Sequence, residues 1–446
     1  MSTVSKPADL TAGPIAPALI RLALPLLFGN ILQQLYNTVD AVIVGRWAGS
    51  DAFAAVGVAG TLMNLFLFLL GGVCAGVAVI FSQQYGARDF AGFRREFFLS
   101  CTFGGLFSVA LSLLALGLTG PLLRLIQTPA ELIPLCVDYL RVIFGGLLVC
   151  FAYNLSASSL RSAGDTLAAL LALGISIAAN VGLDLLFVAR FRWGVAGAAW
   201  ATVVSQTLAA ALAAGYLGWR YPQLLFRRAD MKLDRDLLGR TIRFAAASAL
   251  HHCNLYLGKM LVQGAVNTLG TPGINAYTAA SRIEGFANSF GDSGAAALSV
   301  FVGQNTGAGR PDRVRKGYFD AVKLLAGLGV GMAVVMFAGA EFFSKLLLPT
   351  GEGLELSYSV DYLRTISLFY VLCFTGNSFA GYFQGIGRLN IPVLGATSHI
   401  TMRVILSWVL ARHLGLRAVA VATGIGWIWV NYFWSLVFRG KVLKQT

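Results

Sequence analysis

The pentapeptide Val-Asp-Tyr-Leu-Arg occurs twice in this chain, at Val137–Arg141 and at Val360–Arg364, 223 residues apart. The chain has 446 residues, so this spacing is half of its length. Further polar positions recur at nearly the same offset, for example Gln83 with Gln304. Shared hydrophobicity alone would not reproduce polar positions. The repeats therefore indicate a duplicated chain with two related halves.

The chain is also strongly apolar. Hydrophobic residues make up 57% and charged residues 12% of the sequence, and the mean hydropathy is +0.71. Apolar runs of about 20 residues, the length that crosses a bilayer as a helix, recur along the chain. We therefore predict an all-α integral membrane protein. The twelve expected transmembrane helices lie near 17–43, 52–82, 97–118, 136–157, 167–189, 195–218, 243–268, 275–304, 317–340, 358–383, 391–412 and 416–438.

Each half contains six of these spans, and six is an even number. The second half therefore enters the membrane from the same side as the first, which predicts two six-helix lobes related by a pseudo-two-fold axis along the membrane normal. We expect an N-lobe over 1–218 and a C-lobe over 243–446. Between them, 219–242 is the longest polar stretch and is expected to be a cytoplasmic linker.

The net charge of +14 has two possible explanations, an acidic partner such as nucleic acid or the enrichment of basic residues in cytoplasmic loops. Of the 34 basic residues, 21 lie in the expected inner loops and tails and only 7 in the outer loops. This distribution favours topology over nucleic-acid binding. It predicts a multi-pass protein of the cell (inner) membrane, with both termini in the cytoplasm.

Two carboxylates, Asp40 and Asp184, lie inside apolar spans of the first half. A charge within a bilayer costs about 2.5–3.5 kcal/mol on insertion scales, so such residues usually mark a pathway or a coupling site. Asn180 is one helical turn from Asp184, and Thr202 of the sixth span is expected at a similar depth.

Carboxylate, carboxamide and hydroxyl oxygens are suitable ligands for a hard cation such as Na⁺. Two neighbouring carboxyl groups can also share a proton. The alternative is that these side chains only join helices by hydrogen bonds. Joining helices does not require two ionisable groups at one depth, so we predict a cation-coupling site, with H⁺ or Na⁺ as the ion, at Asp40, Asn180, Asp184 and Thr202.

The second half does not repeat this acidic pattern. At the repeat offset, Asn180 is matched by Arg403 and Asp184 by Ser407. We interpret the polar residues of these spans as charge pairs or substrate contacts, without an assignable coordination site. They are His251, His252, Lys259, Arg282, Glu284, Asp292, His399 and Arg403.

The chain resembles multidrug and toxic compound extrusion (MATE) transporters along nearly its whole length. The motifs that carry the resemblance are Pro25, the stretch Gln33–Asp40, Ser82–Ala87 and Val302–Ala308. The resemblance implies the MATE/MOP superfamily fold, a V-shaped central cleft and a hinge at Pro25. It also implies an N-lobe cation site at the positions that match the four residues above. The seventh span contains no acidic residue, and in this respect the chain resembles the DNA-damage-inducible (DinF-like) group of the family.

We therefore expect a secondary active multidrug efflux transporter that exports organic, cationic or amphipathic compounds by cation antiport through alternating access. The alternative within the superfamily is a flippase for lipid-linked precursors. The sequence shows no nucleophile with a nearby base and no set of metal ligands. We therefore expect neither an enzyme nor a bound cofactor. We expect a monomer surrounded by membrane lipid, with small organic substrates as its partners. Candidate residues for the substrate cleft are Gln33, Tyr36, Asn37, Asn154, Phe286 and Phe290.

Overall fold

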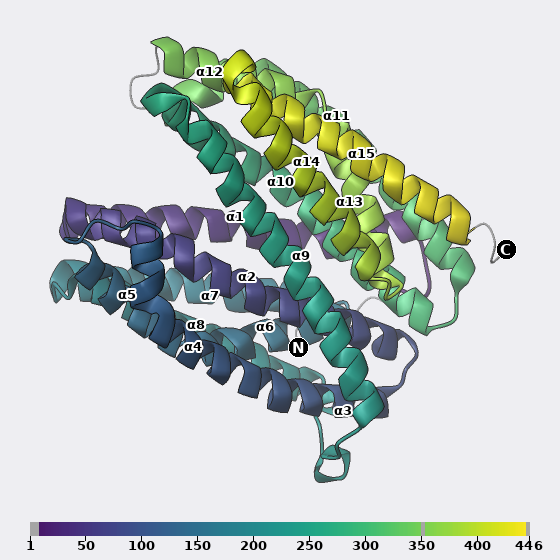
Figure 1. The fold of residues 1–446 in the computed structure, drawn as a ribbon. Helices are drawn as coiled ribbons and strands as arrows, with labels where there is room; N and C mark the ends of the chain where they lie inside the picture. The colour runs from purple at the N-terminus through teal and green to yellow at the C-terminus, as the bar shows by residue number, and fades with distance from the viewer. Residues whose placement is uncertain (1–8, 349–352, 443–446) are drawn as a thin grey trace. The chain divides into compact units, whose positions relative to one another are not determined.

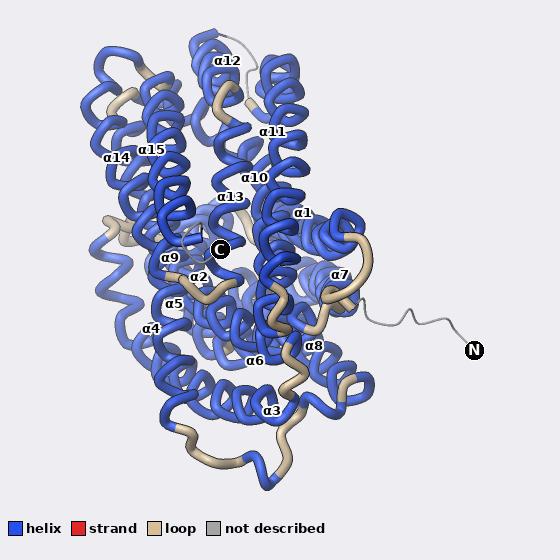
Figure 2. Tube along the Cα trace, turned by 90° about the vertical axis from the view of Figure 1, so that its right-hand side faces the viewer, coloured by secondary structure: helices blue, strands red, loops and turns tan. Residues whose placement is uncertain are grey.

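The computed structural model describes residues 9–348 and 353–442. In these ranges the chain is helical and contains no strand, and short loops join the helices (Figure 2). The helices of the first half are α1 (Ile15–Trp47), α2 (Ser50–Gly86), α3 (Phe90–Leu99), η1 (Ser100–Gly104), α4 (Gly105–Leu125), α5 (Ile133–Gly145), α6 (Leu147–Ser162), α7 (Thr166–Asp184), η2 (Leu185–Arg190) and α8 (Gly194–Arg220).

Two short 3-10 turns, η3 (Pro222–Leu224) and η4 (Arg228–Asp230), connect the halves. The helices of the second half are α9 (Arg235–Asn267), α10 (Gly270–Gly307), α11 (Pro311–Leu347), α12 (Gly353–Ser367), α13 (Tyr370–Gly385), α14 (Asn390–Leu414) and α15 (Arg417–Val442). The predicted all-α membrane fold is thus confirmed.

The number of apolar spans differs from the twelve expected. Within the described residues, eight helices are long and apolar enough to cross a membrane. Two bent pairs, α5 with α6 at 46° and α12 with α13 at 53°, raise this number to ten if each pair is one span. The two other expected spans correspond to α9 and α10. These are 33 and 38 residues long, but their polar residues, such as Lys259 and Asp292, lower their hydropathy.

The chain divides into two compact units by its internal contacts. The first unit contains Leu24–Ala249, and the second contains Thr11–Ala23 together with the chain from Leu250 onward. Helices α1 and α9 therefore each contribute to both units. Helix α1 is continuous through Pro25, the expected hinge, which lies two residues after the change of unit. The expected lobe boundaries, 1–218 and 243–446 with a linker at 219–242, stay a prediction.

Each unit has its own hydrophobic core. In the first unit, buried aromatic rings pair across helices, as in Phe66 with Phe144 at 4.9 Å between ring centroids. In the second unit, the core includes the fully buried Tyr362, Tyr370 and Phe374. Within that unit α14 and α15 run side by side (Figure 1).

Helix α2 packs closely against the first half of α9 at glycine positions. A Cβ atom on Gly72 would lie 2.6 Å from the Cα atom of Ala249, whereas a Cβ on the adjacent Gly71 would meet nothing within 4 Å. Small residues let membrane helices approach each other backbone to backbone. The two neighbouring glycines therefore differ in function, because only Gly72 lies at the helix contact.

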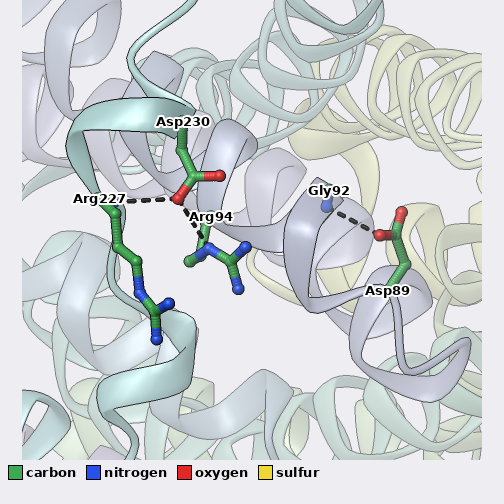
Figure 3. A network of polar contacts seen from close by, with 5 residues as sticks. All are labelled: Asp89, Gly92, Arg94, Arg227 and Asp230. Carbon is green, nitrogen blue, oxygen red and sulfur yellow. Dashed lines mark hydrogen bonds and ion pairs between the residues drawn. The ribbon is translucent and has the colours of Figure 1, made fainter.

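The polar segment before α9 is attached to the first unit. Asp230 accepts hydrogen bonds from Arg94 Nε at 2.7 Å and from the backbone N–H of Arg227 at 3.0 Å (Figure 3). The same figure shows Asp89 accepting from the backbone N–H of Gly92, which caps the start of α3. The Arg94 guanidinium lowers the pKa of Asp230. The stretch expected to be a linker is therefore anchored to α3.

Gly72→Ala tests the contact between α2 and α9. The added methyl group requires a backbone shift, so we expect a loss of about 1–3 kcal/mol, the usual cost of overpacking, and a lower thermal unfolding midpoint in detergent. Gly71→Ala is the matched control and should leave the midpoint unchanged or raise it slightly, because Ala favours the helix. Equal effects of the two substitutions would contradict the assignment of Gly72 to the contact.

The ion pair of Asp230 predicts a pH dependence. A carboxyl whose pKa is lower in the folded state stabilises the fold above its unfolded pKa of about 3.9, and this contribution is lost as the pH falls through the folded value. Asp230→Asn should therefore lower the unfolding midpoint at neutral pH, and the difference from the parent should shrink below a pH of about 4.

Asp234→Asn is the control for this measurement, because Asp234 lies in the same segment but 3.9 Å from Arg95 and is more exposed. Asn also preserves its bond from the Leu237 backbone N–H at the start of α9. Its effect should be close to zero at every pH. A difference for Asp230→Asn that does not change with pH would contradict the ion-pair account.

Candidate cation-binding site

Helices α7 and α8 form the framework of the candidate site. Asp165 caps the start of α7 by accepting from the backbone N–H of Ala168 at 3.1 Å. Asn180 and Asp184 lie one turn apart on α7, and both are buried. The helix changes to the wider π form of η2 directly after Asp184. Such π segments are rare and are frequent at functional sites.

Hydrogen bonds join Asn180, Asp184 and Thr202. In the amide orientation that satisfies both of its ends, Asn180 donates to Asp184 Oδ2 at 2.9 Å and accepts from the backbone N–H of Thr202 at 3.2 Å. Thr202 Oγ1 donates to the carbonyl of Ala198 at 3.0 Å. The Tyr36 hydroxyl, 3.1 Å from Thr202 Oγ1, is therefore the donor in that contact.

Asp40 of α1 completes this cluster. Its side chain is 8% exposed and interacts directly with Asp184. One oxygen of each carboxyl, Oδ1 in both cases, is buried without a hydrogen-bond partner among the described residues. No basic side chain of the described chain forms an ion pair with either acid. The structure thus brings together all four residues predicted for the cation site.

The composition of the cluster limits its chemistry. It offers carboxylate, amide, hydroxyl and phenol oxygens, and the described residues contain no group of three or more His, Cys, Asp or Glu that could hold a metal ion. Oxygen ligands suit hard cations rather than transition metals. Two adjacent carboxyls can also hold one proton between them. The arrangement is therefore chemically suited to a hard cation or to a shared proton.

The residues predicted for a substrate cleft belong to different units. Gln33 of α1 is exposed, and the half-buried Asn154 donates to the carbonyl of Cys150 on its own helix. Phe286 is exposed, whereas Phe290 packs against the core of the second unit. The side chain of Asn37 lies outside the described residues. A cleft formed by these residues stays a prediction.

Two tyrosines of the cluster were not assigned to the cation site from the sequence. Tyr36 was a candidate for the substrate cleft, but its hydroxyl contacts Thr202. Tyr139 lies within electrostatic range of Asp40 and Asp184 and belongs to the repeated pentapeptide. Tyr36 lies four residues before Asp40, and this helical spacing was the available signal.

Comparisons with known proteins agree with this architecture. The MatE family profile matches residues 25–186 and 247–409, so its two copies begin 222 residues apart. The chain is 26% identical over 445 residues to the Probable multidrug resistance protein YpnP of Bacillus subtilis, covering 97% of each chain. It is 25% identical over 323 residues to the FAD transporter of Shewanella oneidensis, covering 71% of each.

Solved structures show the same fold. A MATE crystal structure in the bent conformation matches with a TM-score of 0.92 at 24% identity, covering 99% of this chain and 98% of that one. A MOP superfamily transporter from Pyrococcus furiosus matches with a TM-score of 0.90 at 23% identity over 99% of both chains. With two matches to the family profile and this fold, the chain belongs to the MatE family of multi-pass membrane transporters, whose members are not enzymes.

Proposed function

We propose that this protein is a secondary active exporter of organic compounds, driven by the inward movement of a cation that binds at Asp40, Asn180, Asp184 and Thr202. Members of its family are transporters, and export of a compound against its own gradient requires an energy source, which an ion gradient can supply. The proposal therefore depends on which residues bind the driving cation.

The observation that carries the proposal is the direct contact of two buried carboxyls, Asp40 and Asp184, without a basic partner in the described chain. Burying two like charges together is strongly unfavourable. A cation or a shared proton removes much of this cost. The pair is therefore expected to bind a positive charge whenever it is removed from water and to release it when the site opens.

Cation binding would act on helix α1, which carries Asp40. A bound cation or shared proton would stabilise the contact of Asp40 with Asp184, and its release would let the segment of α1 after Pro25 move away from α7. We propose Pro25 as the hinge of this movement. If this arrangement disfavours the substrate, then substrate and cation each weaken the binding of the other by the same factor, which is the thermodynamic requirement for antiport.

The proposed substrates are organic cations and amphipathic compounds. The names of several relatives support export of such compounds, since they are called multidrug resistance proteins. One relative is named an FAD transporter, so a bulky anion is a second substrate class to include in assays. The acidic pair favours the cationic class, because a positively charged substrate can compete directly with the coupling ion.

We further propose a monomer in the cell (inner) membrane with both termini in the cytoplasm, as the distribution of basic residues predicts. We also propose the DinF-like group as the subgroup of this chain. Its support is the absence of an acidic residue over 243–268, the expected seventh span.

Efflux of a cationic dye from vesicles with separately imposed Na⁺ and proton gradients tests the coupling site. Asp40→Asn and Asp184→Asn each remove one charge of the pair, so gradient-driven efflux should fall by about tenfold or more, within the usual range of coupling energies. Asp51→Asn is the control, because Asp51 is exposed at the start of α2. Undiminished efflux in both variants of the pair would refute the proposed coupling site.

Tyr36→Phe tests whether the Tyr36 hydroxyl contributes to the same cluster. It removes one hydrogen bond to Thr202, worth about 0.5–1.5 kcal/mol. The cation concentration that gives half-maximal thermal stabilisation should therefore rise by a few-fold, without loss of the response. Tyr216→Phe removes a hydroxyl that instead contacts Asp165 and should leave this concentration unchanged. An unaltered response in Tyr36→Phe would exclude Tyr36 from the site.

A further inference from the structure

The repeat places a different set of side chains at the corresponding positions of the second unit. At an offset of 223 residues, Tyr139 corresponds to Tyr362, and Asn180 corresponds to Arg403. In the first unit, Asn180 donates to Asp184, and Tyr139 is in electrostatic range of the acidic pair. The second unit therefore has a guanidinium where the first has a neutral ligand of the candidate cation site.

The contacts of Arg403 connect it to a buried carboxylate. Tyr362 donates its hydroxyl to Glu284 Oε2 at 2.8 Å, and Glu284 is only 8% exposed. Arg403 hydrogen bonds to Tyr362, and its Nη2 atom lies 3.5 Å from the hydroxyl of Tyr277. The two tyrosine rings pack edge to face, with centroids 5.8 Å apart. Tyr362 thus bridges the guanidinium and the carboxylate, since it accepts from one and donates to the other.

A second acidic and a second basic side chain lie near this network. A second carboxylate, Asp292, hydrogen bonds to Asn377, and Lys259 lies within electrostatic range of both Asp292 and Glu284. The second unit therefore has Arg403 joined to Glu284 through Tyr362, with the exposed Lys259 in electrostatic range of both acids. The first unit has two acidic side chains in contact and no basic partner for them among the described residues. Among the described residues, basic side chains therefore lie in electrostatic range of Glu284 and Asp292, whereas Asp40 and Asp184 interact with each other.

We propose that Arg403 acts as a resident cation, which provides permanently in the second unit the positive charge that the first unit takes up and releases in each cycle. Removing one partner of a buried charge pair is strongly destabilising, because the other charge stays uncompensated. A covalently attached cation also has a high effective concentration at its site. Arg403 therefore excludes exchangeable cations from Glu284.

This inference deepens the proposed function, because it assigns the exchangeable cation to the first unit alone. The roles of Arg403 and Glu284 can be measured separately from transport. If Arg403 replaces a bound ion, then removing it should create a new dependence on external cations. If Arg403 only joins helices, then its removal should reduce stability equally in all salts.

The experiment measures the thermal unfolding midpoint of the full chain in detergent, in Na⁺ or in choline buffers and at two pH values. All variants carry Asp40→Asn and Asp184→Asn, so that the first unit no longer responds to cations. On this background, Arg403→Gln should lower the midpoint by several degrees in choline at neutral pH. Na⁺ or a lower pH should restore much of the loss, because either ion can neutralise Glu284.

Three further variants complete the test. Arg403→Lys keeps the charge and should respond little to Na⁺ or pH. Arg403→Gln combined with Glu284→Gln removes one charge of each sign, so it should be more stable than Arg403→Gln alone and show little dependence on cations. Arg364→Gln is the control, because Arg364 is exposed on α12 and lies over the ring of Phe337; it should create no dependence on Na⁺ or pH beyond that of the background.

Two results would overturn the proposal. One is a loss of stability in Arg403→Gln that is equal in Na⁺, in choline and at both pH values. The other is a double variant that is no more stable than Arg403→Gln. A failure of the proposed function looks different, because the parent with intact Asp40 and Asp184 would then show no cation-dependent stabilisation that these two substitutions remove.

Discussion

The contact between Asp40 and Asp184 is the interaction on which this account depends. Two carboxyls that are buried side by side, without a basic partner in the described chain, repel each other when both are ionised. Hydrogen bonds from neighbouring residues hold the cluster in place. Asn180 orients Asp184, the backbone of Thr202 orients Asn180, and Tyr36 contacts Thr202 from the helix that carries Asp40. The site is therefore ordered by hydrogen bonds while its charge is left uncompensated.

The two units differ in how their acidic residues are neutralised. The family profile matches once in each unit, and each unit has two acidic residues within its helices. In the second unit Tyr362 connects Arg403 to Glu284, and Lys259 lies in electrostatic range of Glu284 and Asp292. A carboxylate that is neutralised by an attached guanidinium does not need to bind an exchangeable cation. The difference between the units thus separates a permanent charge network from one that can respond to an ion gradient.

Much of the fold followed from the sequence, because bilayer thickness dictates helix length and the repeat dictates the division into halves. The grouping of Asp40, Asn180, Asp184 and Thr202 was also predictable, since helical spacing and depth are regular within a membrane. The bridging role of Tyr362 was not, because it depends on side-chain contacts between α10, α12 and α14. The anchoring of Asp230 to Arg94 was missed for the same reason. The hydropathy of α9 and α10 was overestimated, since the polar network lies on these helices.

The most direct test of the central claim is the equilibrium binding of ethidium, a cationic dye, to the purified protein over a range of Na⁺ concentrations and pH values. If the pair of Asp40 and Asp184 couples cation to substrate, then raising the concentration of the coupling ion weakens dye binding in the parent. This dependence disappears in Asp184→Asn. Dye affinity that is the same at every Na⁺ concentration and pH would contradict the account, as would a dependence that persists unchanged in the variant.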